Sequence, residues 1–506
     1  MDRIADAVAL EHLDVLIVGA GLSGIGAACR LRARCPGQRF AILEGRDRSG
    51  GTWDLFRYPG ARSDSDMFTL GYPFRPWGGA KAIADAPDIL AYLRETAREQ
   101  GIDRAIRYGH RVVGADWSSE RAAWTVEVEL QPSGEKRRLS CGLLFMCSGY
   151  YRYDAGHAPA FEGAADFAGR VVHPQHWPAD LDVAGKRVVV IGSGATAVTL
   201  VPALAKSAAK VTMLQRSPTW MVSRPSEDGL ATFLRRLLPL GAANAAMRWQ
   251  RILLTLYFFG LCRRRPERAK KLLLGGVRAW MGPGRALDPD FTPRYDPWRQ
   301  RLCLVPDGDL FRALKGGRAA IVTGAIDRFT PGGVRLAGGA EIPADVVVTA
   351  TGLVLEAFGG ATISVDGVPV DWPRRLNYRG AMFSDVPNLV SIFGYSNASW
   401  TLKSDLVARW VCRLLRHMEN TGMRQATPRN ADPAVTGQPW LDLSSGYVQR
   451  SLHLFPQQGS KPPWRLHQNY LRDLLSLRWS RMDDGILVFT RPTKIDPFPR
   501  APAPPP

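Results

Sequence analysis

Residues 12–24 read HLDVLIVGAGLSG, and this stretch decides the fold of the first part of the chain. The run 15–18 is apolar and β-branched, as expected of a strand buried in a parallel sheet. Gly19 allows a tight turn, Gly21 lets the backbone approach a pyrophosphate, and Gly24 lets the following helix pack closely on the strand. The stretch therefore predicts a strand–turn–helix unit that holds a dinucleotide at the helix N-terminus.

The next apolar run, residues 40–43, ends at Glu44, which lies 25 positions after Gly19. A carboxylate at this place accepts hydrogen bonds from ribose hydroxyls and repels a 2′-phosphate. FAD or NAD is therefore the predicted ligand, and NADP is not. Downstream, residues 50–54 read GGTWD, in which two glycines and a tryptophan suit close passage along a flavin. We expect the charged loop 57–66 beside them to contribute to the same site.

A second glycine-rich turn, residues 192–197 with the sequence GSGATA, follows the apolar run 186–191. Its last position is alanine, a variant that the dinucleotide fingerprint permits. Arg216 lies 24 positions after Gly192, where the first unit has Glu44. A guanidinium suits a 2′-phosphate through charge and bidentate hydrogen bonds. The two units therefore carry opposite charges at this position, and the sequence predicts FAD at the first and NADPH at the second.

From these units we expect an α/β fold with two Rossmann-like dinucleotide-binding domains and a helical insert. In the predicted division, the FAD domain takes residues 1–155 and 385–495, the NADPH domain takes 156–222 and 295–384, the insert takes 223–294, and 496–506 form a disordered proline-rich tail.

The stretch 229–282 has a basic and helical pattern. Its apolar segment 252–262 (ILLTLYFFGLC) follows two arginines and is followed by three more at 263–265. The segment is shorter than the ~18 residues expected of a membrane-spanning helix. We expect a core helix in an insert that caps the cleft between the two domains. A helix lying on a membrane surface is the alternative.

The chain has 506 residues, with 66 Lys and Arg against 47 Asp and Glu, and a formal net charge of +19. Such an excess suits phosphorylated cofactors, anionic lipid or nucleic acid, although an arginine-rich composition by itself explains it equally well. The sequence has no clustered basic and aromatic pattern typical of a nucleic-acid-binding module. We therefore expect no nucleic-acid partner.

The seven cysteines are scattered along the chain and form no CxxC pair. This pattern argues against a disulfide framework, a zinc site and a dithiol redox centre, so we expect no metal. Cysteine usage fits a reducing compartment, and acidic residues before the first apolar run argue against a signal peptide. The predicted location is cytoplasmic, with peripheral membrane association through the basic insert as the open alternative.

Between the two glycine-rich turns, residues 167–178 read FAGRVVHPQHWP. The pattern FxGxxxHxxxWP resembles the fingerprint of the type I Baeyer–Villiger monooxygenases, which are class B flavoprotein monooxygenases. The turn, the fingerprint and the second turn also occur in this family's order. Stretches such as 51–60 are most similar to the mycobacterial ethionamide-activating branch of the family.

The resemblance implies FAD and NADPH as cofactors. It matches Arg301 to the active-site arginine of the family, Asp64 to the carboxylate partner of that arginine, and His173 to the linker that couples NADPH movement to catalysis. Many relatives have lysine where this chain has Gln300, so selectivity for NADPH over NADH is expected to be looser. The candidate FAD contacts are Gly19, Gly21, Ser23, Gly24, Glu44, Thr52, Trp53, Asp54, Arg62, Ser63, Asp64, Val112 and Trp400. The candidate NADPH contacts are Gly192, Ser193, Gly194, Ala195, Thr196, Ala197, Arg216 and Ser217.

The resemblance further implies that NADPH reduces the flavin, which then binds O₂ as a C4a-peroxide that attacks a ketone. Arg301 would stabilise the anions, and the product would be an ester or a lactone. Sulfides are the second expected substrate class. The alternatives are a flavin N- or S-monooxygenase and a membrane-surface NAD(P)H:quinone reductase. A disulfide reductase would need a cysteine pair that the sequence lacks, and a non-enzymatic flavin-binding scaffold would show no substrate-dependent NADPH oxidation.

Overall fold

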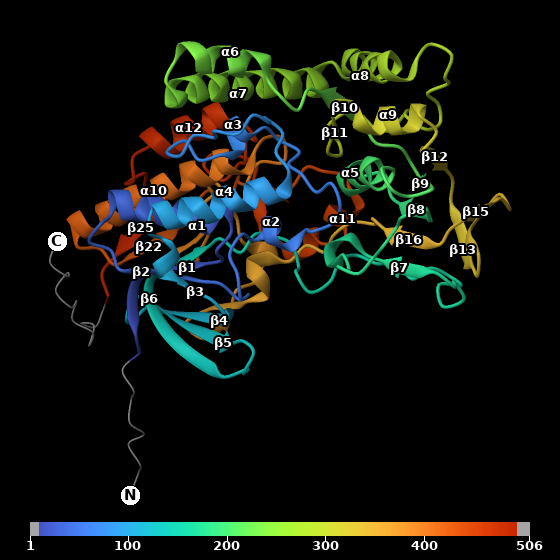
Figure 1. The fold of residues 1–506 in the computed structure, drawn as a ribbon. Coiled ribbons are helices and arrows are strands. Elements are labelled where there is room, and N and C mark those ends of the chain that lie inside the picture. Colours follow the sequence, from blue (N-terminus) through green and yellow to red (C-terminus); the bar gives the residue numbers. More distant parts are fainter. Residues whose placement is uncertain (1–9, 493–506) are drawn as a thin grey trace, which may run out of the picture.

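The computed structural model describes residues 10–492, so the tail predicted at 496–506 lies outside the described residues. Two sheets with covering helices carry the fold (Figure 1). The helices are α1 (Leu22–Arg34), α2 (Thr52–Leu55), α3 (Met67–Leu70), α4 (Ala86–Glu99), α5 (Ala195–Leu204), α6 (Gly229–Leu237), α7 (Leu240–Arg264), α8 (Pro266–Met281), α9 (Asp309–Lys315), α10 (Trp400–Thr421), α11 (Gly446–Gln449) and α12 (Tyr470–Trp479). The strands are β1 (His12–Val18), β2 (Phe40–Leu43), β3 (Ile106–Arg107), β4 (His110–Ser118), β5 (Ala123–Leu130), β6 (Lys136–Met146), β7 (Arg170–Val172), β8 (Arg187–Ile191), β9 (Lys210–Gln215), β10 (Met221–Arg224), β11 (Cys303–Pro306), β12 (Ala319–Thr323), β13 (Ile326–Thr330), β14 (Gly333–Leu336), β15 (Glu341–Pro343), β16 (Val346–Thr349), β17 (Thr362–Val365), β18 (Val368–Pro369), β19 (Asn377–Tyr378), β20 (Met382–Phe383), β21 (Leu389–Ser391), β22 (Gln425–Pro428), β23 (Gly437–Pro439), β24 (Gln457–Gly459) and β25 (Leu487–Thr490).

The first sheet is built around β1, which contains the apolar run predicted to be a buried strand. β1 pairs in parallel with β2 on one side and with β6 on the other. Val15 and Ile17 pack into the core that also contains residues of α1 and α10, whereas Leu16 packs into the core on the opposite face. A strand buried on both faces needs a continuous apolar run, which is what this sequence provides.

The second sheet has the order β12-β9-β8-β16-β7, and all of its pairs are parallel. The run predicted at 186–191 forms β8, and α5 begins directly after the second glycine-rich turn. The predicted α/β class with two Rossmann-like units is therefore confirmed.

One predicted domain boundary is wrong. Residues 295–384 were assigned to the NADPH domain, but β17 pairs in parallel with β4 of the first sheet, with Thr362 opposite Gly114. The chain therefore re-enters the first domain before residue 385. β17 has four residues and no turn motif marks the crossover, so the sequence alone carries little sign of it.

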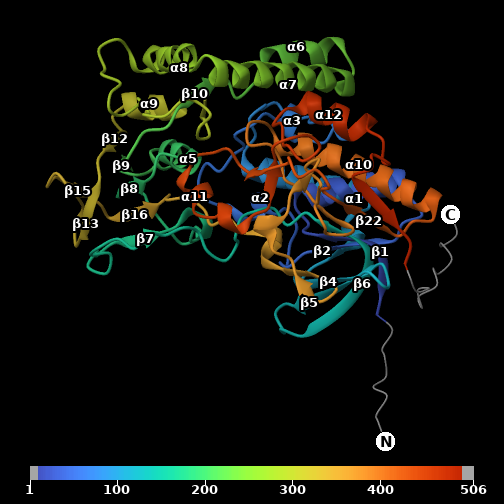
Figure 2. The same cartoon turned by 180° about the vertical axis from the view of Figure 1, so that it is seen from behind.

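The insert forms α6, α7 and α8, which lie along one edge of the molecule, outside α3, α9 and α12 (Figures 1 and 2). The prediction of a core helix at 252–262 is wrong. Ile252 and Cys262 are buried in α7, but Leu253 is 53% exposed and Tyr257 is 70% exposed. Apolar residues surround this helix on all sides, whereas the rest of the protein covers only its inner side.

Candidate active site

One cavity of about 840 Å³ lies between the two glycine-rich turns and joins the predicted cofactor residues from both domains. From the FAD set it is lined by Gly19, Gly21, Ser23, Glu44, Thr52, Trp53, Arg62, Ser63, Asp64, Val112 and Trp400. From the NADPH set it is lined by Gly192, Ser193, Gly194, Ala195, Thr196 and Arg216. We call it the cofactor cavity. Gly24, Asp54, Ala197 and Ser217 are not among its lining residues.

The first glycine-rich turn fits FAD. A Cβ atom on Gly24 would lie 1.9 Å from the carbonyl oxygen of Gly19, so only glycine allows α1 to approach β1 this closely. This makes Gly24 a packing residue, with no contact to the cavity. Gly21 precedes α1, and a Cβ atom there would meet only the backbone of Gly51 at 3.5 Å or more, so the turn leaves room for a phosphate.

Glu44 also fits its predicted place beside a ribose. The carboxylate is buried, and it accepts hydrogen bonds from the backbone N–H of Ala20 at 2.8 Å and of Arg46 at 3.1 Å. Burial raises the pKa of Glu44 above its ordinary value. The two backbone donors hold the carboxylate at the cavity wall, where hydroxyl groups can donate to its remaining lone pairs.

Trp400 and Ser23 hold each other at the cavity wall. The indole N–H of Trp400 donates to the Ser23 hydroxyl at 2.8 Å, and its ring stacks on Tyr150 with 5.2 Å between ring centroids. Tyr150 and the neighbouring Tyr151 share a hydrogen bond of 2.7 Å between their hydroxyls. The sequence reasoning missed both tyrosines, although they directly follow the small-residue turn at the end of β6.

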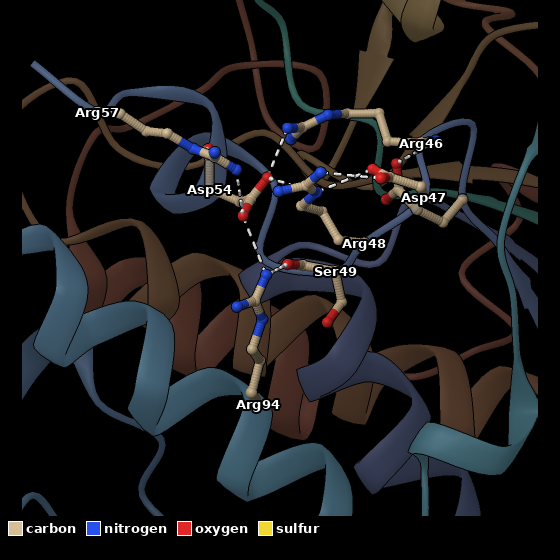
Figure 3. Close-up of polar contacts among 8 residues, drawn as sticks. Arg46, Asp47, Arg48, Ser49, Asp54, Arg57 and Arg94 are labelled. Atoms are coloured by element: carbon tan, nitrogen blue, oxygen red, sulfur yellow. Dashed lines mark hydrogen bonds and ion pairs between the residues drawn. The ribbon is translucent and has the colours of Figure 1, made fainter. Parts of the chain in front are cut away.

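Asp54, predicted to contact FAD, is not among the residues that line the cofactor cavity. Its side chain is only 2% exposed and is directed at arginines (Figure 3). Arg46 pairs with it at 2.5 Å, Arg94 at 2.9 Å and Arg57 at 3.1 Å. The sequence shows GGTWD as one motif, but the short helix α2 turns Asp54 away from the face that carries Thr52 and Trp53.

At the second turn, Arg216 lines the cofactor cavity and is exposed. Within the described residues its guanidinium has no hydrogen-bond or ion-pair partner, so its N–H donors are free to bind a phosphate. Two neighbours differ from the prediction. Ala197 is fully buried in the core, and Ser217 contributes its carbonyl oxygen, which accepts a hydrogen bond from Ser193 at 2.8 Å.

Arg301 and Asp64 form an ion pair of 2.7 Å that crosses from one domain to the other. Asp64 comes from the loop after α2 in the first domain, and Arg301 lies two residues before the start of β11. The negative charge of Asp64 raises the pKa of Arg301, so the guanidinium stays charged. The nearby side chains of Tyr150, Tyr151 and Tyr447 also raise the pKa of Arg301. The family resemblance had paired Arg301 with Asp64, which are far apart in the sequence.

Arg62, predicted as an FAD contact, also forms a cross-domain ion pair. Its Nη1 atom lies 2.5 Å from Asp309 Oδ2 at the start of α9. The neighbouring loop residue Gly60 packs on α5, since a Cβ atom there would lie 2.8 Å from Ala203 Cβ and 3.0 Å from Thr199 O. The loop 57–66 therefore attaches the first domain to the second while it presents Asp64 to the cavity.

The fingerprint segment is part of the second domain, because its residues 170–172 form the edge strand β7. His173 follows, and its Nδ1 atom accepts a hydrogen bond from the backbone N–H of Gln175 at 3.2 Å. Gln175 in turn donates to the carbonyl oxygens of Arg152 at 2.9 Å and Tyr153 at 3.0 Å, on the segment that leaves the first domain. His173 is not among the residues that line the cofactor cavity, and burial lowers its pKa. A direct catalytic contact is therefore not supported, whereas the predicted linker position is retained as a proposal.

A second cavity of about 430 Å³ adjoins the first, and Asp64, Ser65, Arg301, Leu304 and Ala398 line both. We call it the substrate cavity. Its wall includes Ile252, Thr255 and Phe258 of α7, together with Val222, Trp298 and Leu302. The insert therefore covers the substrate side of the cross-domain ion pair.

Other classes of site are absent from the part of the chain that the structure describes. Residues 10–492 contain no group of three or more His, Cys, Asp or Glu side chains that could hold a metal ion. All seven cysteines are buried and free. No helix in these residues combines the length and the apolar composition needed to cross a bilayer.

Known proteins resemble this chain over almost its full length. A family model for flavin-binding monooxygenase-like proteins matches residues 82–238, and one for an NAD(P)-binding Rossmann-like domain matches residues 17–86. "FAD-containing monooxygenase EthA" of Mycobacterium tuberculosis is 52% identical over 482 residues, which cover 95% of this chain and 98% of that protein. "Putative FAD-containing monooxygenase MymA" of the same organism is 50% identical, with 95% and 98% covered.

Solved structures show the same fold. The oxidized steroid monooxygenase bound to NADP has a TM-score of 0.68 at 24% identity, over 82% of this chain and 87% of that one. The ε-caprolactone-bound cyclohexanone monooxygenase has a TM-score of 0.69 at 20% identity, over 83% and 90%. They confirm the predicted fold, and the relatives above confirm that the chain resembles FAD-containing monooxygenases. The chain therefore belongs to the family of FAD-containing monooxygenases.

Proposed function

We propose that this monooxygenase inserts one oxygen atom from O₂ next to a ketone carbonyl, giving an ester or lactone, and that it also oxidises sulfides. The Arg301–Asp64 ion pair carries the proposal. It lies where the cofactor cavity meets the substrate cavity, so one permanently charged group faces both the flavin side and the substrate side.

When bound, the flavin would supply electrons and activate O₂. The residues of the chain do the rest. Glu44 and the first turn hold FAD, and Arg216 and the second turn hold NADPH. Arg301, kept charged by Asp64, stabilises the oxyanion that forms on the attacked carbonyl. The apolar wall formed by Ile252 and Phe258 excludes water from the reacting carbonyl.

Arg301→Ala tests the proposal. We expect ester formation from a simple cyclic ketone to fall by about 10²–10³, because one fixed electrostatic donor is lost. FAD content and reduction of the flavin by NADPH should persist. The matched control is Arg299→Ala, which removes an exposed arginine that lies 3.7 Å from Asp442 and outside both cavities.

Mass spectrometry of the products separates the alternatives. Ester or lactone from a ketone supports the Baeyer–Villiger reaction. Oxygenated sulfides or amines without ester would indicate a flavin N- or S-monooxygenase. Consumption of NAD(P)H with a quinone and without any oxygenated product would indicate a quinone reductase. Wild-type rates of ester formation in Arg301→Ala would overturn the role of this residue.

We also propose that the insert docks on an anionic membrane surface, and its outward face supports this. Both cartoon views show α6, α7 and α8 with no element on their outer side (Figures 1 and 2). Glu267 is the single acidic residue between positions 229 and 281, where arginine and lysine are frequent. Apolar side chains together with a basic helix surface suit anionic lipid headgroups. The exposed apolar residues of the insert include Leu230, Phe233, Leu237, Leu240, Leu253, Tyr257 and Leu272.

Co-sedimentation with vesicles tests the docking. Phosphatidylglycerol vesicles should sediment the wild type and phosphatidylcholine vesicles should not. The double variant Leu253→Glu/Tyr257→Glu should lose binding. The control is Val368→Glu, which should still bind. Val368 is 68% exposed and lies on β18 of the first sheet, away from the insert. Equal sedimentation of the double variant and the control would exclude this face as the docking surface.

A further inference from the structure

Arg224 lines the substrate cavity, but the proposed reaction assigns it no role. It is the last residue of β10, it is partly buried, and it lines the cavity together with Val222 of the same strand. Within the described residues its guanidinium makes no hydrogen bond and no ion pair within 4 Å. Burial and the positive charge of Arg251 lower the pKa of Arg224, and the negative charge of Asp66 acts in the opposite direction. A partly desolvated and unpaired guanidinium is costly unless a ligand provides the partner.

The other charged residues at this end of the cavity are Arg251, Asp228, Asp66 and the exposed Glu227. Arg251 forms an ion pair with Asp228. Asp66 caps α3, where the backbone N–H of Thr69 donates to one carboxylate oxygen at 3.0 Å and the Thr69 hydroxyl donates to the other at 3.1 Å. Arg251 keeps its buried Nε without a hydrogen-bond partner, whereas within the described residues Arg224 has no hydrogen-bond or ion-pair partner for any of its guanidinium nitrogens.

The pairing of β10 with β11 sets the distance between Arg224 and Arg301. In this register Val222 lies opposite Leu304 and Arg224 lies opposite Pro306. The five steps along the chain from position 301 to position 306 span roughly 16 Å at the rise of an extended strand. Val222 and Leu304 line the cavity between the two arginines. The cavity therefore has a cation at each end and an apolar middle.

We propose that Arg224 is a second substrate-binding group, and that the preferred substrates are ketones with an apolar chain that ends in a carboxylate. This inference rests on the proposed function for the ketone end. The carbonyl lies at Arg301 and the chain packs on Val222 and Leu304. The carboxylate accepts bidentate hydrogen bonds from Arg224, for which a guanidinium has the right shape. Arg224 thereby selects the substrate and positions its carbonyl, and it takes no part in bond making.

The experiment compares methyl ketones that end in a carboxylate with their methyl esters, at short, medium and long chain lengths. For the wild-type holoenzyme we expect kcat/KM to be about 10- to 100-fold higher for the acid than for the ester at the best chain length. Arg224→Gln should lower the value for the acid to that for the ester and leave the ester unchanged. Arg224→Lys, which keeps the charge without the fork, should recover part of the preference. Arg299→Gln, a loss of charge outside the cavity, should behave as wild type.

Binding measured without turnover separates this inference from the proposed function. The change in flavin absorbance on titrating each compound without NADPH reports affinity alone. If no ketone is oxygenated but the acid still binds tightly through Arg224, the proposed function fails and the carboxylate site stands. Equal affinity of the wild type for acid and ester, or an equal loss of both in Arg224→Gln, would overturn the carboxylate site.

Discussion

Asp54 lies in α2 and Asp64 lies in the loop that follows. Both carboxylates form ion pairs with arginines, but their surroundings differ. The Asp54 side chain is 2% exposed, and its partners Arg46, Arg57 and Arg94 all belong to the first domain. The Asp64 side chain is 33% exposed, and its partner Arg301 comes from the other domain. The first arrangement closes a buried cluster, whereas the second leaves a charged pair in contact with two cavities.

The difference shows that proximity of an aspartate to arginines does not by itself identify a functional site. A carboxylate enclosed by guanidiniums from its own domain has no position open to a ligand, so its role is structural. A pair at a domain boundary stays accessible and depends on how the domains meet. Stability should therefore depend on the Asp54 cluster, and turnover on the boundary pairs Arg301–Asp64 and Arg62–Asp309.

The largest expected effect is on the Asp54 cluster. Asp54→Asn should lower the free energy of unfolding by about 1.5–3 kcal/mol, because charge-assisted hydrogen bonds from three arginines to one buried carboxylate are weakened. Asp64→Asn should change it by less than about 1 kcal/mol while it strongly lowers product formation. Urea unfolding of the FAD-loaded variants provides the measurement. Similar losses of stability in both variants would remove the distinction.

Arg216→Ala tests an arginine that lines the cofactor cavity between the two domains and has no protein partner within the described residues. The affinity for NADPH should fall by about 1.5–3 kcal/mol, since a charge-assisted hydrogen bond to the 2′-phosphate is lost. The affinity for NADH should hardly change. Arg318→Ala, at an exposed arginine outside the cofactor cavity, is the control. Equal losses for both nucleotides would show that Arg216 does not read the 2′-phosphate.

Asp309→Asn weakens the second cross-domain pair. We expect a loss of about 1 kcal/mol in stability, because the pair is only partly buried. The functional effect should be on coupling. More of the NADPH consumed should appear as hydrogen peroxide and less as product, because the loop that carries Asp64 is less firmly attached to the second domain. Asp309→Glu should restore coupling. Unchanged coupling in Asp309→Asn would confine this pair to a structural role.

The smallest expected effect is a change in acid sensitivity at His173. Because burial lowers its pKa, native His173 takes up a proton at a lower pH than unfolded His173 does. Stability is therefore full above about pH 6.5 and falls as the pH drops through the native pKa. His173→Asn keeps a side chain that can accept the Gln175 N–H but does not titrate. Its melting temperature should fall less than that of the wild type between neutral and mildly acidic pH, and identical falls would contradict the assignment.

The features that the sequence determines are the local ones. A glycine-rich turn between an apolar strand and a helix needs only adjacent residues, so both nucleotide units could be predicted. The same holds for Glu44 and Arg216, which end the second strand of each unit. Resemblance to a family fingerprint extended the prediction to Arg301 and Asp64, which no local pattern pairs.

Tertiary structure decided the contacts between residues far apart in the chain. Arg62 and Asp309 are 247 positions apart, and neither sequence context shows that one needs the other. The direction of Asp54 depends on how α2 turns within the fold, and the exposure of α7 depends on which side the body of the protein covers. The unpaired Arg224 is visible only once β10 and β11 lie side by side. Sequence patterns carry hydrophobic periodicity and turn geometry, whereas the pairing of charges depends on which surfaces the fold brings together.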